Sequence, residues 1–169
     1  MCIRDRNHPA KAVFITGNTA IDALKQTVQT EYNHDILKVV DADKRMILVT
    51  MHRRENQGEP MKRVFKVMRQ VVESHEDVEI VYPVHLNPVV QEAAQSILGN
   101  HPRIHLIDPL DVVDFHNLAA RSYFIMSDSG GVQEEAPSLG KPVLVLRDTT
   151  ERPEGVTAGT LKLVGTQPE

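Results

Sequence analysis

One strand, turn and helix stretch decides the fold, Tyr123-Phe124-Ile125-Met126-Ser127-Asp128-Ser129-Gly130-Gly131-Val132-Gln133-Glu134-Glu135-Ala136-Pro137. Its apolar start, residues 123–126, predicts a buried strand. The small polar residues and the glycine pair predict a turn, and Ser129 is a good N-cap for a helix that runs to about Leu139 and ends at Gly140. The stretch is therefore typical of a parallel α/β sheet.

The turn in this stretch also predicts an anion site. Ser129, Gly130 and Gly131 offer a hydroxyl and backbone N–H groups at a helix start, where the helix dipole is positive and no Cβ blocks an approaching anion. Glu135 follows within the helix, where its carboxylate could accept hydrogen bonds from the hydroxyls of a ribose. The alternative interpretation is a tight turn followed by an ordinary polar helix.

The rest of the chain repeats this alternation. Helices are predicted after Asn18 as an N-cap, from Pro60, from Pro88 and from Asp111, because apolar residues recur there with a period near 3.6. Compact apolar runs predict six strands, at 46–49, 80–82, 104–107, 123–126, 143–146 and 161–164. Six strands with intervening helices predict a Rossmann-like α/β fold, a doubly wound parallel sheet with helices on both faces.

Polar loops follow the predicted strands, at the edge where such sheets bind ligands. His52, Arg53 and Arg54 follow the first strand, and these side chains suit a diphosphate because arginine offers a fork of donors and histidine can move a proton. His85 lies on a loop with a proline on each side, and Arg152 lies in a polar run after the fifth strand. The alternative is a set of solvated surface turns.

Composition limits the function classes. The chain has 169 residues, 41% of them hydrophobic and 25% charged, which fits one globular core. A net charge of −4 argues against a broad nucleic-acid interface, and a single cysteine excludes an internal disulfide and a cysteine-based structural zinc site. No apolar run is long enough for a membrane span or a signal peptide, so we expect a cytoplasmic protein. We also expect no metal site.

At this point the motifs resemble one family, the bacterial non-hydrolysing UDP-N-acetylglucosamine 2-epimerases. The resemblance extends from about Val13 onward and rests on five motifs in family order, Thr16 to Leu24, the His-Arg-Arg-Glu-Asn run at 52–56, Pro83 to Pro88, Ser127 to Pro137, and the Thr-Glu-Arg-Pro-Glu run at 150–154. Members have the two-domain GT-B fold. By resemblance, residues 1–15 are a leader and interdomain crossover, and residues 16–169 are the C-terminal, UDP-binding domain.

The resemblance also implies the chemistry. The family eliminates UDP from UDP-N-acetylglucosamine to give a 2-acetamidoglucal and adds it back on the opposite face, which yields UDP-N-acetylmannosamine without a cofactor or a metal. UDP-N-acetylglucosamine also binds as an activator in bacterial members. Implied roles are the diphosphate site for Ser129, Gly130 and Gly131, ribose binding for Glu135, phosphate binding for Arg152, assistance to UDP departure for His52, and activator binding for Arg53 and His85.

The resemblance further implies that catalytic carboxylates come largely from an N-terminal domain that this sequence lacks. By the same resemblance, the C-terminal helices of the family are also missing. We therefore expect a fragment that binds UDP and is inactive alone, from a parent that is a homodimer. Two alternatives remain open. One is a GT-B glycosyltransferase or a hydrolysing epimerase, which share the fold, and the other is a non-catalytic nucleotide-binding module.

Overall fold

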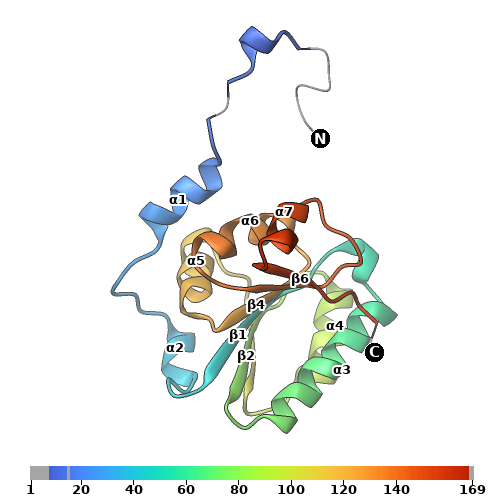
Figure 1. Cartoon of the computed structure of the whole chain (residues 1–169). Helices are drawn as coiled ribbons and strands as arrows, with labels where there is room; N and C mark the ends of the chain where they lie inside the picture. Colours follow the sequence, from blue (N-terminus) through green and yellow to red (C-terminus); the bar gives the residue numbers. More distant parts are fainter. Residues whose placement is uncertain (1–7, 15, 168–169) are drawn as a thin grey trace.

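The computed structural model describes residues 8–14 and 16–167. The expected leader at residues 1–6 lies outside the described residues, as do Ile15 and the last two residues. Of the chain before the first α-helix, residues 8–14 and 16–17 extend away from the domain (Figure 1). Phe14 in this segment is 79% exposed, so its side chain takes no part in the core.

All six predicted strands form one parallel sheet, in the order β3-β2-β1-β4-β5-β6. This is the strand order of a Rossmann-like doubly wound fold, so the predicted fold class is confirmed. The first strand is buried along its length because it lies inside the sheet with helices on both faces. The strands are β1 (Arg45–Thr50), β2 (Val78–Pro83), β3 (Ile104–Ile107), β4 (Phe124–Ser127), β5 (Val143–Val145) and β6 (Leu161–Leu163).

The predicted helices are confirmed within a residue or two at each end. Asn18 caps the first of them by accepting a hydrogen bond from the Ala20 N–H at 3.0 Å. Their bounds are α1 (Thr19–Thr27), α3 (Glu59–Ser74), α4 (Pro88–Leu98), α5 (Val112–Arg121) and α6 (Gly130–Ser138). Four shorter elements were not predicted, because they span too few residues for a periodic pattern: η2 (Ala10–Ala12), α2 (Asp35–Val39), η3 (Arg54–Asn56) and α7 (Pro153–Thr157).

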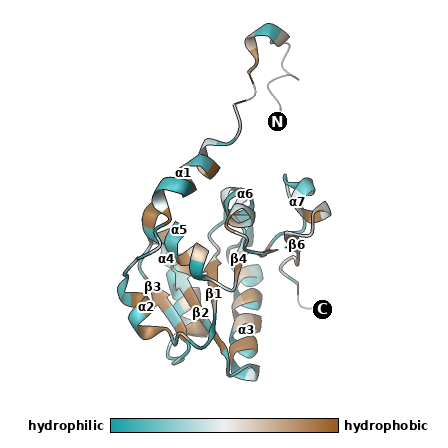
Figure 2. Ribbon diagram, turned by 60° about the vertical axis from the view of Figure 1, so that its left-hand side comes forward, coloured by the Kyte–Doolittle hydropathy of each residue, from teal (hydrophilic) through white to brown (hydrophobic). Residues whose placement is uncertain are grey.

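The core has two layers, one on each face of the sheet. Helices α3 and α4 pack on one face against side chains that include Ile47 and Tyr82. Helices α2, α5 and α6 cover the other face against side chains that include Leu48 and Ile125. The strands form the hydrophobic centre of the ribbon in Figure 2. Among the described residues, no helix is long and apolar enough to cross a membrane.

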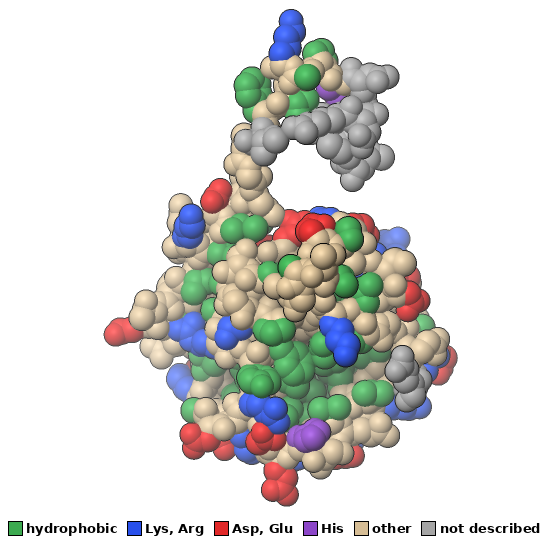
Figure 3. Space-filling model, viewed as in Figure 1, with side chains coloured by type: hydrophobic (Ala, Val, Ile, Leu, Met, Phe, Trp, Pro, Cys, Tyr) green, Lys and Arg blue, Asp and Glu red, His purple; other side chains and the backbone are tan. Residues whose placement is uncertain are grey.

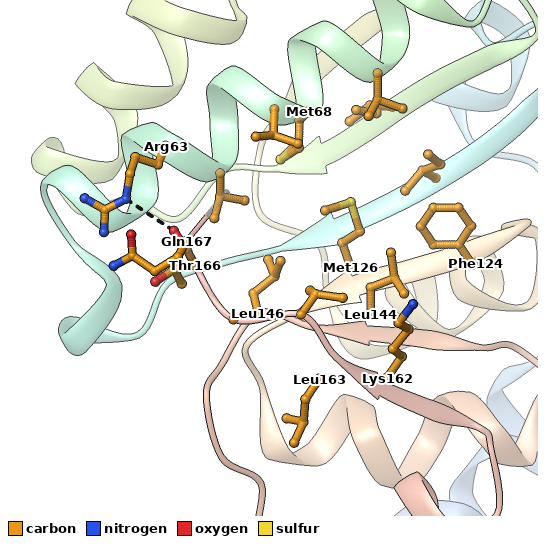
Figure 4. Close-up of a pocket in the computed structure, with 17 residues that line it drawn as sticks. Arg63, Met68, Phe124, Met126, Leu144, Leu146, Lys162, Leu163, Thr166 and Gln167 are labelled. Atoms are coloured by element: carbon orange, nitrogen blue, oxygen red, sulfur yellow. Dashed lines mark hydrogen bonds between the residues drawn. The ribbon is translucent and has the colours of Figure 1, made fainter. Parts of the chain in front are cut away.

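The face that carries α3 has an apolar groove beyond the edge of that helix. The groove has a volume of about 400 Å³ and runs over β4, β5 and β6. In Figure 3 hydrophobic side chains gather in a hollow on this face. Figure 4 shows Phe124, Met126, Leu144 and Leu146 lining the groove, and Arg63 Nε donating to the Thr166 carbonyl at 3.3 Å at one end. Among the described helices, α3 is the one that lines this groove.

Candidate functional site

The sheet places two loops side by side at its centre. Strands β1 and β4 are neighbours, with Thr50 paired to Ser127 at their carboxyl ends. The chain order reverses between these two strands, since β2 and β3 extend to one side and β5 and β6 to the other. Ligands of such sheets bind at this switch point. The loop with His52 and the turn with Ser129 therefore lie where a ligand is expected.

The turn between β4 and α6 presents free donors at a helix start. Ser129 is the N-cap of α6, and its hydroxyl makes no capping hydrogen bond. The backbone N–H of Ser129 donates to the Ser127 hydroxyl at 2.9 Å, and this hydrogen bond fixes the turn to the end of β4. The first N–H groups of a helix lack partners within the helix, so Gly130 and Gly131 can donate to an anion.

Glu135 lies next to this turn. A Cβ built on Gly131 would lie 3.9 Å from both Glu135 Oε1 and Ser129 Oγ, so the carboxylate and the hydroxyl border the same small space. The other oxygen, Glu135 Oε2, lies 3.6 Å from Nε2 of His116. His116 is 3% exposed, and its Nδ1 is 2.8 Å from the Thr27 hydroxyl. Glu135 thus has one oxygen toward the turn and the other toward His116.

The loop after β1 brings the predicted cations to the same place. The rings of His52 and His85 stack, with centroids 5.6 Å apart and planes at 11°. A Cβ on Gly130 would lie 3.9 Å from Nη2 of Arg53, so this guanidinium reaches the turn before α6. Arg53 Nη1 also donates to Glu55 Oε1 at 3.3 Å, as the alternative interpretation of this loop expected.

A cavity of about 440 Å³ joins these parts. Its size suits a nucleotide-sized ligand. Its wall combines predicted site residues with apolar side chains from α5 and the loop before it. The lining residues that the sequence had singled out are His52, His85, Ser129, Gly131 and Glu135, and Phe115 and Leu110 add apolar surface.

Arg152 lies apart from this cavity. It lines a neighbouring one of about 420 Å³ on the other side of α6, together with Asn18 and Gln133. Its guanidinium pairs with the Glu134 carboxylate, which also accepts from Asn18 Nδ2. The phosphate role of Arg152 stays a prediction, and it would require the side chain to leave Glu134.

The polar run after β5 is ordered by ion pairs. Arg147 donates to both oxygens of Glu151, from Nη1 at 2.7 Å and from Nη2 at 2.8 Å. These hydrogen bonds lower the pKa of Glu151 to about 2. The Thr150 hydroxyl donates to the Gln133 side chain and accepts from the Arg152 N–H at 3.0 Å. The loop is therefore tied to helix α6.

Sequence reasoning missed the residue that organises the site. Asp128 is completely buried, and its carboxylate accepts from the N–H groups of His52 and Arg53 and from the side chain of Asn56. The sequence signal was weak, because a single aspartate after a strand has many roles. His116 of α5 is also buried, and its Nδ1 lies within hydrogen-bond distance of the Thr27 hydroxyl.

The geometry can be compared with known proteins. The family model for UDP-N-acetylglucosamine 2-epimerase matches residues 2–169. The UDP-N-acetylglucosamine 2-epimerase of Bacillus subtilis is 66% identical over 163 residues, which are 96% of this chain and 43% of that protein. The chain therefore spans less than half the length of this curated relative.

Solved structures agree in fold. The Staphylococcus aureus MnaA–UDP co-structure is 57% identical with a TM-score of 0.91, over 97% of this chain and 45% of that one. The Neisseria meningitidis UDP-GlcNAc 2-epimerase bound to UDP-GlcNAc is 42% identical with a TM-score of 0.85, over 97% and 46%. An E. coli heptosyltransferase, 14% identical with a TM-score of 0.54 over 78% of this chain and 37% of that one, shares the fold alone.

These matches and the strand order confirm the GT-B type of Rossmann-like unit. The matches also confirm the family resemblance that was inferred from the five motifs. The chain belongs to the UDP-N-acetylglucosamine 2-epimerase family.

Proposed function

We propose that this chain supplies the UDP-binding half of an enzyme that converts UDP-N-acetylglucosamine to UDP-N-acetylmannosamine. The observation that carries the proposal is the shared space at the start of α6, where the Ser129 hydroxyl, the glycine N–H groups and the Glu135 carboxylate meet beside His52 and Arg53. A diphosphate fits the donors, and ribose hydroxyls fit the carboxylate. Related proteins solved with UDP or UDP-GlcNAc support the ligand class.

In the proposed reaction a proton leaves C2 of the sugar as the bond from C1 to the UDP oxygen breaks, which gives UDP and a 2-acetamidoglucal. UDP then adds back to C1 while a proton returns to C2 on the opposite face. His52 lines the cavity and assists UDP departure by donating to the leaving phosphate oxygen. The donors at the helix start stabilise the charge on the departing diphosphate.

The proposal extends to the whole protein. Residues 16–169 form the C-terminal UDP-binding domain of a cytoplasmic homodimer. The catalytic carboxylates that act on the sugar come from another domain. UDP-N-acetylglucosamine also acts as an activator that contacts Arg53 and His85. The position of His85 supports this assignment, because its ring stacks on that of His52 and both residues line the cavity.

Replacing Glu135 with alanine tests the ribose contact. We expect UDP affinity of the chain to fall by about 1–3 kcal/mol, because a partly buried acceptor of the ribose hydroxyls is lost. Isothermal titration calorimetry with UDP measures the change. Glu92→Ala is the matched control, since it removes an exposed carboxylate from α4. Unchanged UDP affinity in Glu135→Ala would refute the ribose role.

A hybrid enzyme tests the activity. This chain would replace the matching region of the Bacillus subtilis epimerase, to which it is 66% identical. We expect the hybrid to convert UDP-N-acetylglucosamine to UDP-N-acetylmannosamine, as followed by NMR of the sugar protons. The alternatives give other results. A hydrolysing half would release UDP without forming UDP-N-acetylmannosamine, whereas a glycosyltransferase half without an acceptor, or a non-catalytic module, would leave the substrate unchanged.

A further inference from the structure

The Asp128 carboxylate has no exposed surface and binds three donors of the loop after β1. The Arg53 N–H donates to Oδ2 at 2.9 Å, and the His52 N–H lies 3.1 Å from Oδ2 and 3.3 Å from Oδ1. Asn56 Nδ2 donates to Oδ2 at 2.9 Å and to the Leu146 carbonyl at 3.3 Å. The buried carboxylate thus joins the loop after β1 to the end of β4, and Asn56 joins the same loop to the end of β5.

We propose that Asp128 is a positioning residue that fixes the turn at His52 and Arg53 so that both side chains face the anion turn before α6. The inference rests on the proposed function of that turn. Asp128 follows β4 directly, and its own N–H donates to the Thr50 carbonyl at 3.2 Å. Its backbone is therefore part of the sheet, and the sheet sets the position of its carboxylate.

The donors explain why a carboxylate is needed at this position. An ionised carboxylate has about four lone-pair sites, whereas an asparagine oxygen has two. Hydrogen bonds to a charged acceptor are also roughly twice as strong as neutral ones. Asp128→Asn therefore keeps the shape of the side chain, but the three donors then share one weaker acceptor oxygen. As a result, the turn at His52 and Arg53 loses its single conformation.

The orientation of His52 follows from the same contacts. Its backbone N–H is held by Asp128, and its Nδ1 lies 3.8 Å from Asp128 Oδ1. The ring then reaches the cavity wall, where it stacks on His85. Among the described residues, no hydrogen bond or ion pair joins Glu135 to this network, and its Oε2 lies 3.6 Å from Nε2 of His116 on another helix. Asp128 should therefore affect the phosphate part of the ligand and leave the ribose part unchanged.

The test compares two ligands that differ only in phosphate. NMR titrations of the full chain measure the dissociation constants of UDP and uridine for the wild type, Asp128→Asn and the control Asp43→Asn, which makes the same charge change on an exposed turn before β1. We expect Asp128→Asn to lose about 10- to 100-fold in UDP affinity. Uridine affinity should stay within twofold of the wild type, and Asp43→Asn should change neither by more than about twofold.

Amide hydrogen exchange without ligand gives a second readout. We expect exchange at His52 and Arg53 to become at least about tenfold faster in Asp128→Asn, with the strand amides of β1 and β4 unchanged. If Asp128→Asn does not fold, Asn56→Ala replaces it, because that variant removes one side-chain donor and keeps both backbone donors. Its expected loss is about two- to tenfold, again for UDP alone.

Equal losses for UDP and uridine, or no loss for either, would overturn the positioning role. If the wild-type chain binds UDP no better than uridine, the proposed function fails, and hydrogen exchange then decides the inference by itself. Unchanged exchange at His52 and Arg53 would overturn it, whereas faster exchange confined to that turn would support it.

Discussion

Replacing His52 with alanine in the hybrid enzyme should lower kcat by about 10²- to 10⁴-fold, the usual contribution of a positioned acid or base. His52 lines the cavity, and its backbone N–H is held by Asp128. Its ring is about half exposed, so a ligand can reach it. UDP affinity should fall by less than about tenfold, because the donors at the start of α6, which we propose bind the diphosphate, are unchanged.

The role of His52 is decided by comparing the loss of kcat with the loss of UDP affinity. A group that acts in the transition state lowers turnover more than ground-state binding. Steady-state kinetics of epimer formation and calorimetry with UDP measure the two quantities on the same protein. His75→Ala is the control, because His75 is exposed at the end of α3, before β2 starts. Equal losses of turnover and UDP affinity would remove the case for a chemical role of His52.

Replacing Phe65 with alanine should lower the free energy of unfolding by about 3–5 kcal/mol. Phe65 has no exposed surface, and its ring packs against Tyr82 of β2 with centroids 5.5 Å apart. The loss would be a large fraction of a typical stability of about 5–15 kcal/mol. It would also loosen the loop after β1, since the Tyr82 hydroxyl donates to the Met51 carbonyl at 2.8 Å. Urea unfolding followed by circular dichroism measures it.

Val67→Ala on the same helix is the control for Phe65→Ala. Val67 is 37% exposed on the rim of the apolar groove, so its expected loss is below about 1 kcal/mol. A loss of less than about 1 kcal/mol for Phe65→Ala would contradict the assignment of α3 to the core.

The fold could be predicted because burial dictates it. A strand such as β1, covered on both faces, must be apolar along its length, and that signal needs no partner to be known. Helix α3 shows its buried face at Met61, Phe65 and Met68 with a helical period. Helices α2 and α7 have five residues each, and so short a segment cannot show this period. Tertiary contacts decide such elements.

The candidate site was predicted only where a motif contains its own geometry. Ser129, Gly130 and Glu135 lie on one turn and one helix, so their spacing fixes their neighbourhood. The stacking of His52 on His85 depends on how two loops fold over the sheet edge. The pairing of Arg152 with Glu134 also depends on the fold, since either side chain could have paired with another residue of opposite charge.

Asp128 was missed for a related reason. Its partners are mostly backbone N–H groups of another loop, and backbone donors leave no mark in a sequence. Asn56 belongs to the predicted motif at 52–56, but its burial could not be predicted, because a polar residue in a charged loop is usually solvated, and here it is 5% exposed. A buried carboxylate of this kind becomes visible only when the sheet order is known.

The most direct measurement is a crystal structure of this chain with UDP. The account predicts diphosphate oxygens within hydrogen-bond distance of the N–H groups of Gly130 and Gly131 and of the Ser129 hydroxyl. It also predicts both ribose hydroxyls at the Glu135 carboxylate. UDP bound elsewhere, for example beside Arg152 or in the apolar groove, with Glu135 still turned to His116, would contradict the account.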